Sequence, residues 1–347
     1  WIMAYTDIDK PSDYFETVLY AGNSGTQSIT SLDFQPDWCW FKARNNTDTH
    51  AVFDSVRGVT KRLIPDNTTA EGTQSNGLTH FLSNGFTVAD AGIVNQGYNY
   101  VAWNWKAGTS FTNDASSTGI GTIDSAGSAS DDSGFSIVSY TGTGSAGTIK
   151  HGLSATANFM IIKNRDAARS WNVYFGDQTK YMYLNDTAAQ ADAGTIIWNN
   201  TAPTSSVFSI GTDNGVNQSG EKYIAYVFSQ KQGYSKFGSY TGNGNADGPM
   251  IVTGMKPAWL LIKETTQTRN WVLYDNKRVG YNPNQYEFLP DTSNAEDTST
   301  TKVDLLSNGF KIRASHSTVN QSGENYIFMC FAENPFVTST GVPATAR

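Results

Sequence analysis

Histidine and cysteine side chains are the first candidates for chemistry, because they most often serve as general bases, nucleophiles and metal ligands. The chain has four histidines, and none shares a position with another once the internal repeats are aligned: His50, His80, His151 and His316. No His-x-x-x-His or Cys-x-x-Cys spacing occurs, and the sequence has neither a calcium-binding loop nor a Gly-x-Ser-x-Gly motif. The sequence therefore predicts no catalytic residue, no metal site and no cofactor.

One pair of opposite charges does recur. An aspartate is followed three residues later by an arginine just after the third strand-like segment of two repeats, and a looser acidic–basic pair occupies nearly the same place in the other. We interpret the two close matches as structural ion pairs that hold a turn, rather than as a ligand site. The pairs are Asp54 with Arg57, Asp275 with Arg278 and, less closely, Asp177 with Lys180.

Aromatic residues could form stacking platforms for sugars, since the chain has 9 Trp and 17 Tyr. Most of the tryptophans fall at repeated strand positions, where core packing is the better interpretation. Trp198 differs, because it stands in a loop-like stretch with Asn199 and Asn200 and has no counterpart elsewhere. A ring beside side-chain amides suits a sugar face and its hydroxyl groups. We therefore expect these three residues to form an exposed ligand contact.

Self-similarity is the strongest signal in the sequence. Six landmarks recur in the same order, among them an apolar run closed by a lysine, at Lys42, Lys163 and Lys263. We expect these lysines to lay their stems over aromatic rings while their charged ends reach water. A Val-Asn-Gln motif, beginning at Val94, Val216 and Val319, precedes the last apolar strand of each repeat. Cys39 and Cys330 fall in strand-like segments and are expected to be buried thiols rather than a disulfide.

Each repeat offers about six short strands separated by turn signals, which predicts an all-β protein. We expect three tandem copies of a small antiparallel β-sandwich, lectin-like or jelly-roll-like. The second and sixth strands are apolar on successive residues, which indicates that both of their faces are covered. The predicted organisation is repeat 1 at 1–106, a flexible Gly/Ser-rich linker at 107–133, repeat 2 at 134–232, repeat 3 at 233–336 and an extended tail at 337–347.

The composition of the chain limits the classes of partner that we expect. Charged residues make up 16% of the chain and the net charge of −7 is spread thinly, so no basic stripe favours nucleic acid. No apolar run approaches the ~18 residues that a membrane helix needs. We expect neither nucleic acid nor a membrane as a partner.

Five strings carry a resemblance that spans essentially the whole chain. They are Met3-Ala4-Tyr5-Thr6-Asp7-Ile8-Asp9, Phe53-Asp54-Ser55-Val56-Arg57-Gly58, Tyr100-Val101-Ala102-Trp103-Asn104-Trp105-Lys106-Ala107-Gly108, the run from Tyr234 to Gly244, and Glu333-Asn334-Pro335-Phe336. With them the chain resembles a family of marine phage proteins found beside virion and tail-fibre genes. The resemblance implies a virion-associated role and carries over no catalytic residue.

Three functions follow as hypotheses. The favoured one is a non-enzymatic protein of the virion surface, an appendage or fibre module that recognises glycans of the host surface. The second is a structural decoration or cement protein that binds other virion proteins. The third is a glycan depolymerase, the weakest because no paired carboxylates recur at strand ends. By analogy with particle symmetry we expect a homo-oligomer, with a trimer favoured.

Overall fold

The computed structural model describes residues 6–299 and 301–345. Nearly all elements within these ranges are β-strands, and each of the four α-helices has only four residues. The fold class predicted from the sequence, all-β with antiparallel pairing, is confirmed. The first residues of the Met3 motif, up to Tyr5, lie outside the described residues.

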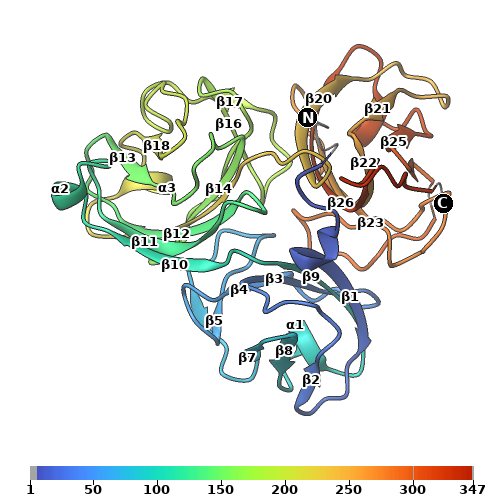
Figure 1. Ribbon diagram of the computed structural model, residues 1–347, viewed down its shortest axis with the longest axis horizontal. Helices are drawn as coiled ribbons and strands as arrows, with labels where there is room; N and C mark the ends of the chain where they lie inside the picture. Colours follow the sequence, from blue (N-terminus) through green and yellow to red (C-terminus); the bar gives the residue numbers. More distant parts are fainter. Residues whose placement is uncertain (1–5, 300, 346–347) are drawn as a thin grey trace.

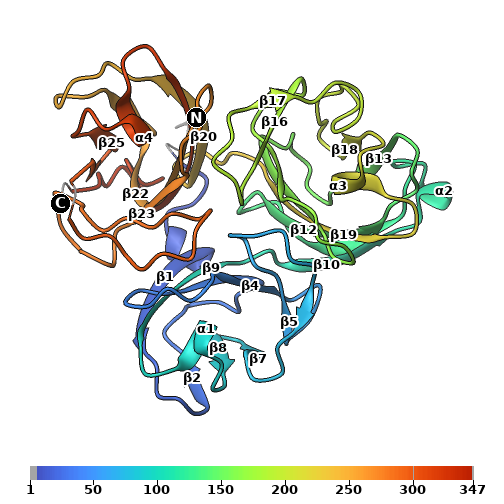
Figure 2. The ribbon, with the colours of Figure 1, turned by 180° about the vertical axis from the view of Figure 1, so that it is seen from behind.

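Three lobes surround a common centre (Figures 1 and 2). The first lobe spans residues 15–105, the second 109–228 and the third 235–335. We call the sheet of each lobe that faces the centre its inner sheet. In the first and third lobes the inner sheets have the same strand order: β1 (Phe15–Ala21), β9 (Asn99–Trp105), β3 (Trp38–Ala43), β4 (Ala51–Asp54); and β20 (Ser235–Thr241), β26 (Asn325–Pro335), β22 (Met255–Glu264), β23 (Val272–Asp275).

The inner sheet of the second lobe contains the same order and extends it at both edges. Its eight strands run β10 (Thr109–Asn113), β11 (Ser125–Ser130), β12 (Phe135–Thr141), β19 (Lys222–Phe228), β14 (Phe159–Asn164), β15 (Asn172–Tyr174), β16 (Lys180–Tyr183), β17 (Ala191–Asp192).

A shorter outer sheet covers the far side of each inner sheet. The outer sheets are β2 (Gln27–Ile29), β8 (Gly85–Val88), β7 (Leu78–Leu82); β13 (Gly147–Lys150), β18 (Val207–Ile210); and β21 (Met250–Val252), β25 (Gly309–Ile312), β24 (Val303–Leu306). The remaining elements are η1 (Pro11–Asp13), β5 (Lys61–Arg62), β6 (Gly72–Thr73), α1 (Gly92–Asn95), α2 (Ala115–Thr118), α3 (Asn214–Asn217) and α4 (Ser317–Asn320).

The middle strands of the inner sheets, such as β3, β14 and β22, are buried on both faces, which explains their continuous apolar runs. Along β3, Trp38 and Trp40 point into a central core shared by all three lobes, whereas Cys39 and Phe41 point into the core of the first lobe itself. The central core is largely aromatic: the ring of Trp38 stacks on Tyr226 of the second lobe with centroids 4.6 Å apart. Both cysteines are free and buried, as the sequence predicted.

The segment 107–133, predicted to be a flexible linker, instead forms ordered structure. Strands β10 and β11 pair in continuous register and join the inner sheet through β12. The small residues are needed for close packing: a Cβ on Gly127 would lie 2.0 Å from the carbonyl oxygen of Ile137, and one on Gly152 would lie 2.5 Å from the ring of Phe111. A composition typical of flexibility therefore belongs here to the closely packed edge strand β10 and its neighbour β11.

The same contacts recur at the Val-Asn-Gln motif of each lobe. Tyrosine hydroxyls donate to the valine carbonyls over 2.6, 2.7 and 2.8 Å, in the pairs Tyr20–Val94, Tyr140–Val216 and Tyr240–Val319. The asparagine that follows each valine is buried and bonded to a neighbouring loop: Asn95, Asn217 and Asn320. These contacts support the interpretation of the lobes as three copies of one unit, which stays a prediction.

Candidate functional site

Trp198, predicted to be an exposed ligand contact, is buried and only 1% exposed. Its Nε1 donates to the carbonyl oxygen of Lys180 over 2.9 Å, and its ring meets Tyr174 edge-on in the core of the second lobe. Asn199 and Asn200 adopt left-handed backbone conformations, with φ of 49° and 45°, which asparagine tolerates better than most residues. The prediction was wrong because a tryptophan beside turn residues here anchors the turn in the core.

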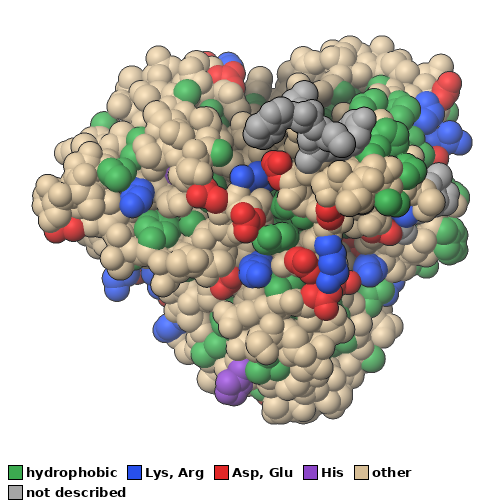
Figure 3. Space-filling model, in the orientation of Figure 1, with side chains coloured by type: hydrophobic (Ala, Val, Ile, Leu, Met, Phe, Trp, Pro, Cys, Tyr) green, Lys and Arg blue, Asp and Glu red, His purple; other side chains and the backbone are tan. Residues whose placement is uncertain are grey.

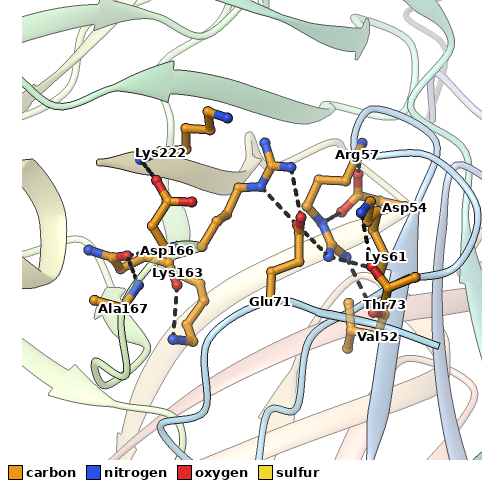
Figure 4. A network of polar contacts seen from close by, with 12 residues as sticks. Val52, Asp54, Arg57, Lys61, Glu71, Thr73, Lys163, Asp166, Ala167 and Lys222 are labelled. Atoms are coloured by element: carbon orange, nitrogen blue, oxygen red, sulfur yellow. Dashed lines mark hydrogen bonds and ion pairs between the residues drawn. The ribbon is translucent and has the colours of Figure 1, made fainter. Parts of the chain in front are cut away.

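The first ion pair holds the seam between the first and second lobes (Figure 4). Asp54 and Arg57 are completely buried and paired. Tyr226, from the second lobe, donates to Asp54 over 2.7 Å. Glu71 lies between two guanidinium groups, accepting from Arg57 over 3.2 Å and from Arg165 of the second lobe over 2.8 Å. Burial raises the pKa of Glu71, but the two arginines outweigh it and leave that pKa below its ordinary value.

The second ion pair holds the seam between the third and first lobes in the same way. Asp275 pairs with Arg278, again with both side chains buried, and Trp103 of the first lobe donates to Asp275 over 3.0 Å. Glu296 then joins Arg278, over 2.9 Å, to Arg44 of the first lobe, over 2.8 Å. Each pair is thus one end of a chain of charges that crosses a seam.

The remaining seam, between the second and third lobes, has the same backbone contact without the charges. At each seam a backbone N–H donates to a backbone carbonyl over 2.8 Å. The pairs are Glu71 to Arg165, Gln190 to Thr265 and Glu296 to Arg44. At the positions that carry the charge chain elsewhere, this seam has Phe175, Gln178, Gln190, Thr265 and Met329. Asp177 and Lys180 therefore do not form the equivalent pair; Lys180 instead binds Asp192 at the surface.

The sequence interpretation missed the residues that complete these chains. Arg44, Arg165 and Thr265 each stand two residues after the repeated lysine, so the alignment held a usable signal for one half of each contact. Glu71 and Glu296 lie in loops too variable to align. Only the structure brings those glutamates to the arginines.

The repeated lysines are buried, contrary to the prediction that their charged ends reach water. Lys163 donates from Nζ to the carbonyl oxygens of Thr68, Asn164 and Arg169 over 2.9–3.1 Å. Burial lowers the pKa of Lys163 to about 7 and the pKa values of Lys42 and Lys263 to about 8. All three lysines donate to backbone carbonyl groups: Lys42 and Lys263 within their own lobes, and Lys163 also to Thr68 of the first lobe.

The residues that the structure describes form several open clefts. One, of about 530 Å³, lies where the start of the first lobe meets β10 and β11 of the second. Its walls include the rings of Tyr14 and Phe111 and the exposed carboxylates of Asp131 and Asp132. On the face shown in Figure 3, many of the charged side chains gather near the junction of the lobes, and others lie at the outer edges.

Among residues 6–299 and 301–345, no three His, Cys, Asp or Glu side chains gather in a way that could hold a metal ion. In the same ranges no helix is long and apolar enough to cross a membrane.

We compared the sequence of the chain with models of protein families. A family model described as a domain of unknown function (DUF7483) matches residues 10–335, which include all three lobes and the seams between them. No curated protein matches the chain. Since the family model covers nearly the whole chain, the protein belongs to the DUF7483 family.

Proposed function

We propose that the protein is a non-enzymatic recognition module of a virion surface, part of an appendage or fibre, that binds glycans of the host cell. The observation that carries the proposal is the cleft formed by Tyr14, Phe111, Asp131 and Asp132. Aromatic faces pack against the apolar face of a sugar, and carboxylates accept hydrogen bonds from its hydroxyl groups. The virion setting rests on the resemblance to phage proteins.

The arrangement of the lobes supports the same function. Two ion pairs with fully buried side chains, Asp54 with Arg57 and Asp275 with Arg278, hold neighbouring lobes together. The shared aromatic core adds a rigid centre from which the loops point outward. Loops on a rigid β-scaffold are a common way to present a binding surface.

The test is binding of the intact chain to a glycan array and to host cells. Asp132→Ala removes an exposed carboxylate of the cleft and should weaken binding at least tenfold, while leaving the melting temperature unchanged. Asp192→Ala, which removes an exposed carboxylate elsewhere on the second lobe, should leave binding unchanged. An intact chain that binds no glycan and no cell would overturn the proposal.

One observation favours the alternative of a decoration protein that binds other virion proteins or further copies of itself. Strand β21 is an edge strand that pairs only with β25, and its side chains Met250 and Val252 are 51% and 61% exposed. Figure 3 shows an apolar patch over this part of the third lobe. Unpaired edges of this kind can accept a strand from another chain. Loss of particle assembly in Val252→Lys, with glycan binding intact, would favour this alternative.

A further inference from the structure

A second cleft, of about 360 Å³, lies in the second lobe at its seam with the first. Its walls include Thr68 from the first lobe and Arg169, Asn172, Asp213 and Gly215 from the second. The volume is at the lower end of the range for small-molecule sites.

The other two lobes fill the corresponding place with larger or apolar side chains. Asn172 pairs with the residue before the repeated lysine, as do Ala51 and Val272 in their lobes. Gly215 precedes the Val-Asn-Gln motif, where the first lobe has Ile93, packed against its core. A Cβ on Gly215 would lie 2.6 Å from Nδ2 of Asn172. The glycine therefore makes room for the asparagine in the second lobe alone.

Two polar groups of this cleft lack partners. Asn172 is only 1% exposed, and its buried Oδ1 accepts no hydrogen bond. An unsatisfied buried acceptor is destabilising, so a ligand donor that reached it would be stabilising. Within the described part of the chain, the exposed guanidinium of Arg169 has no ion-pair or hydrogen-bond partner. Asp213 adds a carboxylate whose Oδ1 accepts from the backbone nitrogen of Gly215 over 2.6 Å.

The local charge also differs from that of the other lobes. Beside Lys42, the half-buried carboxylate of Asp66 accepts from the backbone nitrogen of His50. Beside Lys263, the buried carboxylate of Asp291 accepts from the backbone nitrogen of Trp271. At the matching place in the second lobe, Asn185 accepts from Trp171.

Lys163 thus lacks the carboxylate that its counterparts have. Its Nζ donates to the carbonyls of Thr68 and Arg169, two residues of the cleft wall. The second lobe therefore has an amino group with no carboxylate beside it behind the cleft, and the guanidinium of Arg169 at its mouth.

We propose that this cleft binds an acidic sugar, with the sugar carboxylate on Arg169 and sugar hydroxyl groups donating to Asn172 and Asp213. A guanidinium presents two parallel donors that match a carboxylate, whereas Asn172 and Asp213 present acceptors that match hydroxyl groups. The inference rests on the proposed glycan-binding function and names a substrate class and a second site for it.

The experiment is a titration of the intact chain with methyl glucuronide and, as a matched neutral probe, methyl glucoside. The glucuronide should bind at least tenfold more tightly than the glucoside. Arg169→Gln should remove that preference, and Arg269→Gln, at the matching position of the third lobe, should retain it. Asn185→Asp should also weaken glucuronide binding, since it supplies the missing carboxylate from inside. Gly215→Ile should block both probes, and its melting curve will show whether the lobe still folds.

Equal binding of the two probes, or an unchanged preference in Arg169→Gln, would overturn the acidic-sugar site. If the wild-type chain still binds glycans on the array, the proposed function survives that failure. If neither the probes nor the array shows binding, both proposals are wrong.

Discussion

Glu71 of the first lobe accepts a hydrogen bond from Arg165 of the second over 2.8 Å, and the contact ties together segments 94 residues apart in the sequence. Glu296 and Arg44 repeat this relationship across the seam that joins the last lobe to the first. The third seam replaces both partners with Gln190 and Thr265. The ring of lobes is therefore closed by two charged seams and one uncharged seam.

This asymmetry predicts that matched substitutions at the charged and uncharged seams lower the free energy of unfolding by different amounts. Glu71→Ala leaves Arg165 and part of Arg57 without a partner in a largely buried seam, and should lower the free energy of unfolding by about 2–3 kcal/mol. Chemical denaturation followed by tryptophan fluorescence measures it, since the central core holds several tryptophans. Gln190→Ala is the matched control and should cost less than about 1 kcal/mol. Equal costs at the two seams would contradict the role given to the charges.

The buried lysines predict that stability rises at moderately alkaline pH. The pKa of Lys163 is about 7 in the folded chain, and its ordinary value is 10.5. Between these values the unfolded chain binds more protons, so raising the pH favours the folded state by up to ~1.4 kcal/mol per pH unit for this group. Lys42 and Lys263 add to the effect above about pH 8.

Lys163→Met should therefore reduce the slope of unfolding free energy against pH, measured between about pH 8 and 9, by ~1.4 kcal/mol per unit. The slope, rather than the stability itself, is the readout, because the substitution also removes three hydrogen bonds. Lys222→Met, at an exposed lysine of the same lobe, should leave the slope unchanged. A wild-type stability that is flat or falling over this interval would contradict the prediction.

The sequence was sufficient for the fold class, because strand-forming runs and turn signals depend on local residue types. Cys39 and Cys330 were correctly predicted as buried thiols, since each stands within a continuous apolar strand. The apolar runs also indicated strands covered on both faces, and the shared core behind Trp38 shows what covers the second face.

The predictions that failed concerned residues whose burial depends on segments distant in the sequence. Lys163 looks like any lysine at the end of a strand, and only the neighbouring lobe, through Thr68, makes its site buried. Trp198 stands directly before the turn residues Asn199 and Asn200, yet its ring reaches Tyr174 in the core. Such contacts come from segments distant in the sequence, so residue type and spacing do not reveal them.

Trp198→Ala should act on stability rather than directly on recognition. Removing a buried indole should lower the free energy of unfolding by about 3–5 kcal/mol. Asn200→Ser changes an exposed residue of the same turn and should cost much less. Denaturation and glycan binding of both variants, compared at a temperature where each is folded, separate the two roles. A stable Trp198→Ala variant with lost binding would restore the exposed-contact hypothesis.

The last prediction concerns the segment first expected to be a linker. In a flexible linker Gly127→Ala would be neutral, because the chain could move away from the added methyl group. In the paired strands the Cβ would lie 2.0 Å from the carbonyl oxygen of Ile137 and 3.0 Å from the ring of Phe111, so β11 must shift away from β12. We expect a loss of about 1–3 kcal/mol, the usual range for overpacking. Gly72→Ala is the matched control, since nothing lies within 4 Å of its added Cβ, and it should stay within about 0.5 kcal/mol of wild type. Equal stability of the two variants would mean that β10 and β11 are not held against the sheet in solution.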